Sequence, residues 1–170
     1  SLISSARAYC ETHTGAYIGE QTWDLSFDGF PKAERRFNPR AELVIPAHPL
    51  ISITSVKYLD AAGVEQTLAS NLYRVTRGFN SKIAILDTWP DTFDGSQTVT
   101  VRAKLGWKKG ANVSIGETEI PADLYQALKI LICHWYEYRA EIYTGGMQLF
   151  EMPKHMSVER ICKAYSRVNL

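Results

Sequence analysis

The sequence predicts an α+β protein in which helices near both ends of the chain pack together around an inserted antiparallel β region. Two observations support this expectation. Apolar residues recur every three or four positions at the start of the chain and again after residue 120, the period of a helix with one buried face. Between about residues 17 and 107 the apolar period is two, and turn residues separate short segments, as in a small sheet, sandwich or open barrel. The helical ends then meet across the insertion.

The composition is that of an ordinary globular chain. Its 170 residues suit one domain that buries a real core, and we expect residues 1–170 to form a single domain. The formal net charge of +1 gives no broad attraction to nucleic acid or to a membrane surface. No apolar run approaches the roughly 20 residues that a transmembrane helix needs, and no segment has the pattern of a signal peptide. We therefore expect no membrane partner.

Three helices are expected, at about residues 1–14, 121–144 and 157–168. Pro121 suits the first turn of the middle helix, because its φ is helical and its missing N–H would have no partner there. The apolar face of this helix contains Leu124, Leu128, Leu131, Trp135 and Tyr138, and it is widened by Ala127, Ile130, Ile132 and Cys133. A helix with so broad an apolar surface is expected to be the central scaffold, lying against the other two helices or against a neighbouring chain.

The β insertion is expected to contain seven short strands. Trp23, Leu25 and Phe27 alternate with polar residues in the first of them, which predicts a strand with one wet face and places Trp23 in the core. A turn at residues 60–63 joins two of the segments into a hairpin, because Gly63 can adopt positive φ. The expected strands are 22–28, 43–45, 51–59, 64–68, 73–75, 82–86 and 98–105.

A metal site would have to be built around His134 and Glu137, which are three residues apart on the middle helix. Helical di-metal sites need further carboxylates and a second histidine from other helices. Here the available supplements are Glu141 on the same helix and Glu11 and His13 on the first. We therefore expect no metal, with His134 and Glu137 on the polar edge of a packed helix.

The other candidate catalytic residues are equally isolated. His48 has no serine or cysteine in a nucleophile-elbow context to activate. Asp87, Asp91 and Asp94 lie close together in sequence, but glycoside cleavage would need an opposed acid across a cleft, and we expect an acidic solvated loop instead. No glycine-rich phosphate loop occurs. The sequence therefore predicts a protein that is not an enzyme and holds no cofactor, with an enzyme built on the Asp87–Asp94 loop as a rival that would require a deep pocket there.

Cysteine usage also gives no sign of a metal centre. Cys10, Cys133 and Cys162 are three widely spaced residues within expected helices. An odd number at such spacing describes neither a disulfide framework nor a zinc site. Free cysteine packs as a small apolar residue, so we expect three buried, reduced thiols.

Tryptophan raises the question of ligand stacking. Trp23 and Trp135 fall on apolar faces and are expected in the core, whereas Trp89 and Trp107 fall in or next to loops. An exposed indole can stack on a sugar or on a partner protein. Trp89 and Trp107 are therefore possible interface aromatics. If they stood side by side on a sheet face, they would favour the alternative function of a carbohydrate-binding or tail-associated β module.

The last helix has two different sides. Its apolar side contains Val158, Ile161, Cys162, Tyr165 and Val168. Arg160, Lys163 and Arg167 form a cationic stripe opposite, and Lys154 precedes them. One interpretation is a solvated face. The other is a helix that docks against an acidic partner, where cations fix the register and apolar residues bury area.

Several strings of residues, taken in order, carry a family resemblance. Their succession resembles the head–tail connector, or head-completion adaptor, proteins of long-tailed bacteriophages, in the longer form with a β region between the helices. Together they cover nearly the whole chain. The strings are 2–15 (LISSARAYCETHTG), 21–25 (QTWDL), 45–68 (IPAHPLISITSVKYLDAAGVEQTL), 73–75 (YRV), 120–139 (IPADLYQALKILICHWYEYR) and 158–167.

The resemblance implies a structural role in a virion. Such adaptors form a ring beneath the portal at the capsid vertex, extend the DNA channel, and present a platform to a neck, stopper or tail-completion protein. The implied partners are other copies of the chain, the portal and the next neck protein, with double-stranded DNA passing through the ring without sequence-specific binding. The implied location is the head–tail junction, and the host cytoplasm during assembly.

On this basis we expect the C-terminal segment to be the element that docks on the portal. It follows Gly145 and Gly146, which we expect to act as a hinge. Cations on this arm would face acidic groups, while its apolar residues pack. The predicted portal contacts are Lys154, Met156, Arg160, Ile161, Lys163, Tyr165 and Arg167, together with Met152.

Overall fold

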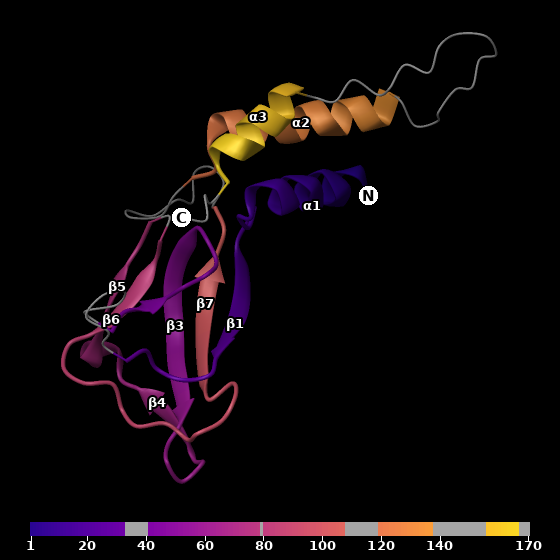
Figure 1. The fold of residues 1–170 in the computed structure, drawn as a ribbon. Helices are drawn as coiled ribbons and strands as arrows, with labels where there is room; N and C mark the ends of the chain where they lie inside the picture. Colours follow the sequence, from indigo (N-terminus) through magenta and orange to yellow (C-terminus); the bar gives the residue numbers. More distant parts are fainter. Residues whose placement is uncertain (33–40, 79, 108–118, 138–155, 167–170) are drawn as a thin grey trace.

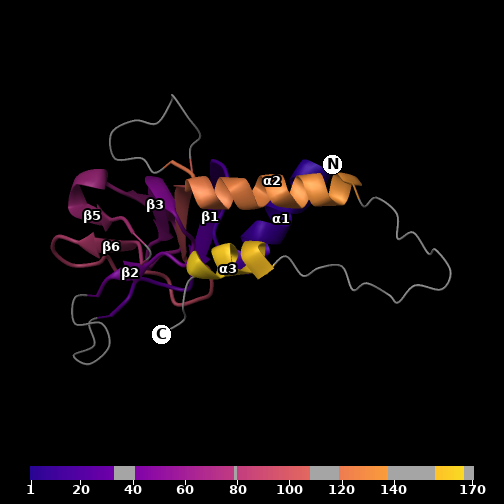
Figure 2. The ribbon, with the colours of Figure 1, turned by 90° about the horizontal axis from the view of Figure 1, so that it is seen from above.

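The computed structural model describes residues 1–32, 41–78, 80–107, 119–137 and 156–166. Its α+β architecture confirms the predicted fold class, with a helical layer at one end of the molecule and two antiparallel sheets filling the rest (Figure 1). The helices are α1 (Leu2–Thr14), α2 (Ala122–Glu137) and α3 (Met156–Ala164). Seen from above, they lie beside one another (Figure 2).

Every expected strand is present, with its bounds within two residues of the expected ones. The strands are β1 (Gln21–Phe27), β2 (Leu43–Val44), β3 (Leu50–Leu59), β4 (Glu65–Leu68), β5 (Tyr73–Thr76), β6 (Lys82–Ile85) and β7 (Val99–Leu105), and a short 3-10 turn, η1 (Ser70–Leu72), precedes β5. The larger sheet has the order β1-β7-β3-β4, and the smaller has the order β2-β6-β5. All pairs are antiparallel.

The two sheets share one core because each turns an apolar face toward the other. Central strand β7 shows the predicted alternation: Val99, Val101, Ala103 and Leu105 are fully buried, whereas Arg102 between them is exposed. The smaller sheet contributes Leu43, Tyr73 and Ile83 to the same cluster. The sheets therefore form a small sandwich.

The helical layer has a separate core. α2 contacts both α1 and α3, as expected, and α1 also contacts α3, so the three helices pack on one another. The buried face of α2 in this core contains Leu124, Ala127 and Leu131. Its partners are small, since Ala6 and Cys10 of α1 and Val158 and Cys162 of α3 are fully buried against it.

Two chain crossings join this layer to the sandwich. α1 ends at Gly15, whose φ of 66° is left-handed and whose N–H donates to the Glu11 carbonyl, as predicted for a glycine stop. After β7, Gly106 has a φ of 107°, and a Cβ on it would collide with the Gly19 carbonyl that precedes β1. Only glycine fits at this second crossing, because both the backbone angle and the space exclude a side chain.

The structure corrects three expectations about burial. Trp23 is 43% exposed instead of forming part of the core, because β1 is the outermost strand of its sheet. Cys133 is exposed, because α2 packs through one face and this thiol points away from it. His134 was expected on a polar edge but is 9% exposed, one further turn along the buried face from Leu131. Residues 138–144 of the expected middle helix lie outside the described residues.

Candidate functional site

The last helix is fastened to the rest of the helical layer. Val158 and Cys162 are fully buried against the other helices. At the end of α3, the Tyr165 hydroxyl donates to the carboxylate of Asp123 in the first turn of α2, at 2.8 Å from Oδ1 and 3.0 Å from Oδ2. This hydrogen bond raises the pKa of Tyr165. The described part of the C-terminal segment is thus a packed element and not a free arm.

This packing divides the predicted portal contacts into two groups. Ile161 and Tyr165 are half-buried against the chain's own helical core, because they lie on the same side of α3 as its buried residues. Arg160 and Lys163 are exposed, and neither forms an ion pair with another described residue. The cationic side of α3 is therefore the one that is open to a partner. Lys154, Arg167, Met152 and the side chain of Met156 lie outside the described residues.

The two loop tryptophans do not form an exposed platform. Trp107 is 7% exposed and belongs to the helical core, where it meets the edge of Tyr165 at 6.5 Å between ring centroids. Trp89 is half-buried against the sandwich, stacked on Phe30 at 4.4 Å, and its indole N–H donates to the Ala41 carbonyl. They pack in different cores, so the side-by-side arrangement that would favour a carbohydrate-binding module is absent from the described chain.

The candidate catalytic and metal-binding residues are also dispersed. No group of three potential ligands gathers among the described residues. His13 stacks on Tyr9, and Glu11 faces β1, where its Oε1 accepts from the Ile18 N–H at 2.7 Å and from Gln21 at 3.0 Å. His134 and Glu137 line a shallow depression on α2 of about 440 Å³, and Glu141 lies outside the described residues. His48 is buried beside Pro49.

The acidic loop after β6 is solvated, as expected. Asp87, Asp91 and Asp94 are all exposed. Neither the depression on α2 nor the one beside β1 is lined by any of them. Within the described chain these carboxylates are thus open to solvent, whereas glycoside cleavage would need them to face each other across a cleft.

The outer face of the larger sheet is charged but balanced. Arg102 on β7 donates twice to the Asp24 carboxylate of β1, with both distances 2.7 Å. Lys104 pairs with Glu20, and Lys57 pairs with Glu65. The hydrogen bonds from Arg102 lower the pKa of Asp24. Each described cation of this face has its own carboxylate, so the described part of the face has no basic stripe that would follow a phosphate backbone.

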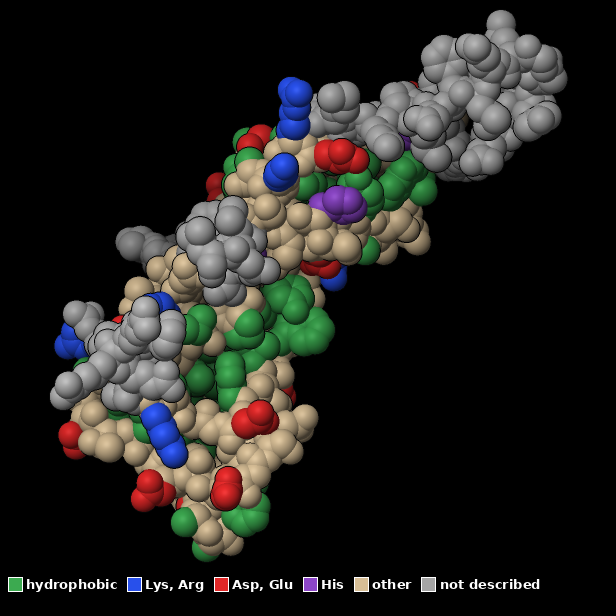
Figure 3. Space-filling view, viewed as in Figure 1, with side chains coloured by type: hydrophobic (Ala, Val, Ile, Leu, Met, Phe, Trp, Pro, Cys, Tyr) green, Lys and Arg blue, Asp and Glu red, His purple; other side chains and the backbone are tan. Residues whose placement is uncertain are grey.

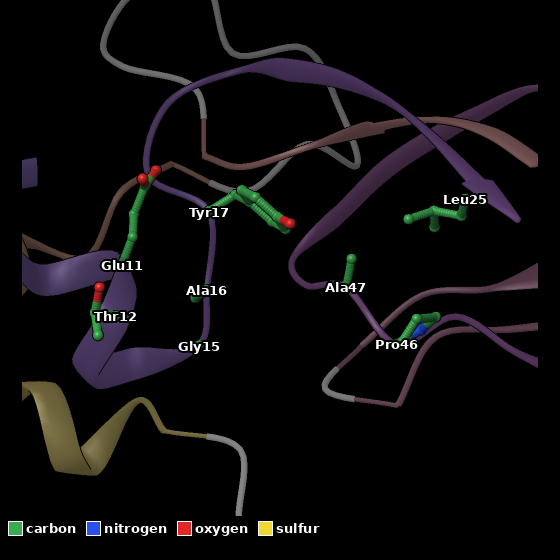
Figure 4. Close-up of a pocket in the computed structure, with 8 residues that line it drawn as sticks. All are labelled: Glu11, Thr12, Gly15, Ala16, Tyr17, Leu25, Pro46 and Ala47. Atoms are coloured by element: carbon green, nitrogen blue, oxygen red, sulfur yellow. The ribbon is translucent and has the colours of Figure 1, made fainter. Parts of the chain in front are cut away.

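A different kind of surface lies at the free edge of β1. Figure 4 shows the Tyr17 ring projecting from the segment after α1 toward Ala47, with Leu25 of β1 beyond it. The Trp23 ring lies 5.3 Å from Tyr17 between centroids. The depression has a volume of about 460 Å³ and is lined by Glu11, Thr12, Gly15, Ala16, Tyr17, Leu25, Pro46 and Ala47. In Figure 3, hydrophobic side chains gather over the strands below the helical layer, whereas charged ones are scattered.

The helices carry no sign of membrane insertion: within the described residues, none has both the length and the hydrophobicity to cross a bilayer. Local sequence patterns could not have revealed the β1 edge surface, since its residues come from three segments that only the fold brings together. The signal in the sequence was Trp23, a large apolar residue on a strand with alternating apolar and polar residues. The sequence does not show that this strand is at the edge of its sheet, so the exposure of Trp23 could not be predicted.

Comparisons with known proteins bear on the fold. A scan against protein-family models and a search of curated proteins gave no match. Among solved structures, the chain is similar to one described as the virion of a native gene transfer agent (GTA) particle, with a TM-score of 0.71, 21% identity, and coverage of 99% of this chain and 76% of that one. It is also similar to the neck of the native GTA particle computed with C12 symmetry, with a TM-score of 0.69, 20% identity and coverage of 99% and 81%. A chain from the neck of the empty GTA particle, computed with C6 symmetry, matches with a TM-score of 0.69 and 20% identity over 99% of this chain and 76% of that one. This chain therefore has the fold of chains found in the neck and virion of a gene transfer agent particle.

Proposed function

We propose that this chain is a structural virion protein: an adaptor that forms a ring between the capsid portal and the tail or neck and extends the DNA channel. The observation that carries the proposal is the fold match over 99% of the chain to neck and virion chains. The family resemblance of the sequence points to the same role. The dispersion of the candidate catalytic residues within the described chain agrees with a structural part.

Ring formation is supported by symmetry. The similar neck structures were computed with C12 and C6 symmetry, as expected for assemblies of repeated subunits around an axis. A subunit of a ring joins its neighbours through two unlike surfaces. We propose that this chain does the same and that DNA passes through the ring without sequence-specific contacts. The near-neutral net charge and the balanced outer face of the larger sheet suit such a conduit.

We propose that the portal is met by the cationic side of α3. Arg160 and Lys163 are exposed on a helix whose apolar side is already covered by the chain itself. Lys154 and Arg167 extend the same stripe in sequence. Docking on an acidic surface through cations is expected to act mainly on the rate of association, because exposed ion pairs each contribute only about 0–1 kcal/mol.

The test is association with the purified portal of the same particle. A variant with Arg160→Glu and Lys163→Glu should bind portal rings more slowly than the wild type, and the difference should shrink as salt is added. Lys32→Glu with Lys129→Glu is the matched control, since it reverses two exposed cations on other elements. If both variants bind at the wild-type rate, α3 is not the docking element; if the wild type does not bind portals at all, the adaptor role is wrong.

A further inference from the structure

The free edge of β1 is unusually open for a sheet edge. β1 pairs with β7 on one side through all seven of its residues without a bulge, and no described strand lies along its other side. Exposed edges in monomeric proteins are normally blunted by proline, by lysine, by a bulge or by a covering segment, because unpaired N–H and C=O groups recruit other chains. The β1 sequence, QTWDLSF, contains neither proline nor lysine, and its one charged side chain, Asp24, is held by Arg102 of β7. Trp23 near the centre of the strand is 43% exposed.

The apolar depression beside this edge extends the surface. Tyr17, Leu25, Pro46 and Ala47 line it (Figure 4). The Trp23 ring packs next to Tyr17. We call these five residues the β1 groove. Pro46 and Trp23 are exposed, and Tyr17 and Leu25 are half-buried, so the groove offers apolar area that this chain leaves partly uncovered.

A second apolar surface lies at the other side of the sandwich. Leu72 of η1 is 45% exposed, and Leu86 just after β6 is 57% exposed. They are adjacent, since the Leu86 N–H donates to the Leu72 carbonyl at 2.9 Å. We call them the leucine pair. Strands β5 and β6, which they flank, lie on the side of the molecule away from β1 in both views (Figures 1 and 2).

The two surfaces carry few charges. Arg74, two residues after Leu72, is exposed and forms no ion pair with described residues, and the carboxylate of Asp87 directly follows Leu86. At the β1 groove, Glu11 lines the depression and is paired with Arg7. Exposed apolar area is therefore the main property that the two surfaces share.

We propose that the β1 groove of one subunit receives the leucine pair of a second copy of this chain, and that repetition of this contact closes the ring. Two unlike surfaces on opposite sides of a subunit produce a head-to-tail contact, which closes into a ring when the rotation allows. A two-fold dimer would instead need one surface that complements itself. The proposal rests on the proposed function, and it adds the surfaces through which the subunits meet.

The first arm of the test locates the contact. Trp23 is replaced by the photo-crosslinking residue benzoylphenylalanine, the protein is irradiated at its highest soluble concentration and on portal rings, and crosslinked peptides are mapped. We expect adducts to residues 70–77 or 84–88 of another copy. Adducts that map to the β1 region of the second copy would indicate a two-fold dimer, and adducts to any other region, or none, would equally overturn the proposal.

The second arm uses the head-to-tail direction of the contact, in which the β1 groove of one copy meets the leucine pair of the next. Trp23→Lys removes the groove, and Leu72→Lys with Leu86→Lys removes the leucine pair. Either variant alone should associate at least about tenfold more weakly than the wild type, because a central tryptophan or apolar anchor dominates an interface. An equimolar mixture should form a heterodimer and nothing larger, because one intact contact remains and both ends are blocked. Val64→Lys, at an exposed position of the β3–β4 hairpin that belongs to neither surface, is the matched control.

The outcomes separate this inference from the proposed function. If all variants form wild-type rings on portals, the inference is wrong and the adaptor role stands. If the wild type forms no ring, alone or on portals, both are wrong. Circular dichroism of each variant should match the wild type, since all the substituted side chains are exposed.

Discussion

The sandwich and the helical layer are built in opposite ways. The sandwich fills its interior with large side chains such as Val101, Leu105 and Ile83, all fully buried, and strand pairing holds it together. The helical layer brings together three helices from distant parts of the sequence, and many of its contacts are small: Ala6, Cys10 and Ala127. Small residues let helices approach closely, but each buries little apolar area. The core of the sandwich is thus made mainly of large side chains, whereas the helical layer depends on a few of them, such as Leu124 and Leu131.

The outer surfaces differ in the same way. The outer face of the larger sheet is covered by paired charges, while α2 exposes Cys133 and Tyr136, the latter by 61%. The helical layer, whose core has fewer large side chains, thus also leaves one side of α2 exposed.

The largest expected effect tests whether the two regions form one domain. Leu131→Asp would place an unpaired carboxylate at a side chain that is 3% exposed, at a cost of at least several kcal/mol. We expect no soluble, folded protein from this variant. If it instead stays soluble with a cooperatively melting sandwich, seen by circular dichroism and calorimetry, the helical layer is an independent unit and the single-domain account is wrong.

The junction between the regions comes next. Gly106→Ala would force a side chain onto the Gly19 carbonyl at a φ of 107°, and should lower the free energy of unfolding by about 3 kcal/mol. Gly63→Ala is the control, because its φ of 79° is also left-handed but an added Cβ would make only an ordinary contact with the Phe93 ring at 4.0 Å, so about 1 kcal/mol is expected. Equal losses in urea unfolding would show that the crossing is not tightly packed.

A smaller effect is expected where α3 meets α2. Tyr165→Phe removes the hydroxyl that donates to Asp123 and should destabilise the protein by about 1 kcal/mol in denaturant unfolding. The ring stays in contact with Trp107, so the near-ultraviolet signal of that indole should be kept. Tyr58→Phe, in the sandwich, is the matched control. A loss no greater than in the control would mean that this hydrogen bond does not hold α3 in place.

The smallest effect concerns the balanced outer face. Because Arg102 lowers the pKa of Asp24, the ionised carboxylate is favoured in the folded state. Its contribution is complete above the unfolded pKa of about 3.9 and is lost as the pH falls through the lower folded value. Asp24→Asn should therefore reduce the acid dependence of stability below that pH and change little at neutral pH. An unchanged acid profile, followed by thermal melting, would contradict this role for the ion pair.

Local patterns were sufficient to predict the elements but not their neighbours. Alternation in residues 98–105 located β7. Pro121 marked the start of α2: it directly precedes the helix, and its carbonyl accepts a hydrogen bond from the Tyr125 N–H. Sheet order is a non-local property, so the sequence could not show that β1 is an edge strand or that Trp23 is exposed. Trp107 illustrates the reverse error, since its position next to a loop suggested exposure while long-range packing with α3 buries it.

The proposed site could be predicted only in part for the same reason. The cationic stripe of α3 follows from helical spacing, and the exposed Arg160 and Lys163 agree with it. The apolar residues of that helix have the same spacing whether they meet a partner or the chain's own core, and the structure places Ile161 and Tyr165 against the core. The β1 groove and the leucine pair depend on contacts between segments that are far apart in sequence, and no local period signals them.

The adaptor role is tested most directly by electron cryomicroscopy of this protein mixed with purified portal rings of its own particle. The account predicts a closed ring of this chain bound coaxially to the portal, with the cationic side of α3 against it, neighbouring subunits in contact, and an open central channel. A portal that carries no added ring, or one that carries isolated copies which do not touch one another, would contradict the account.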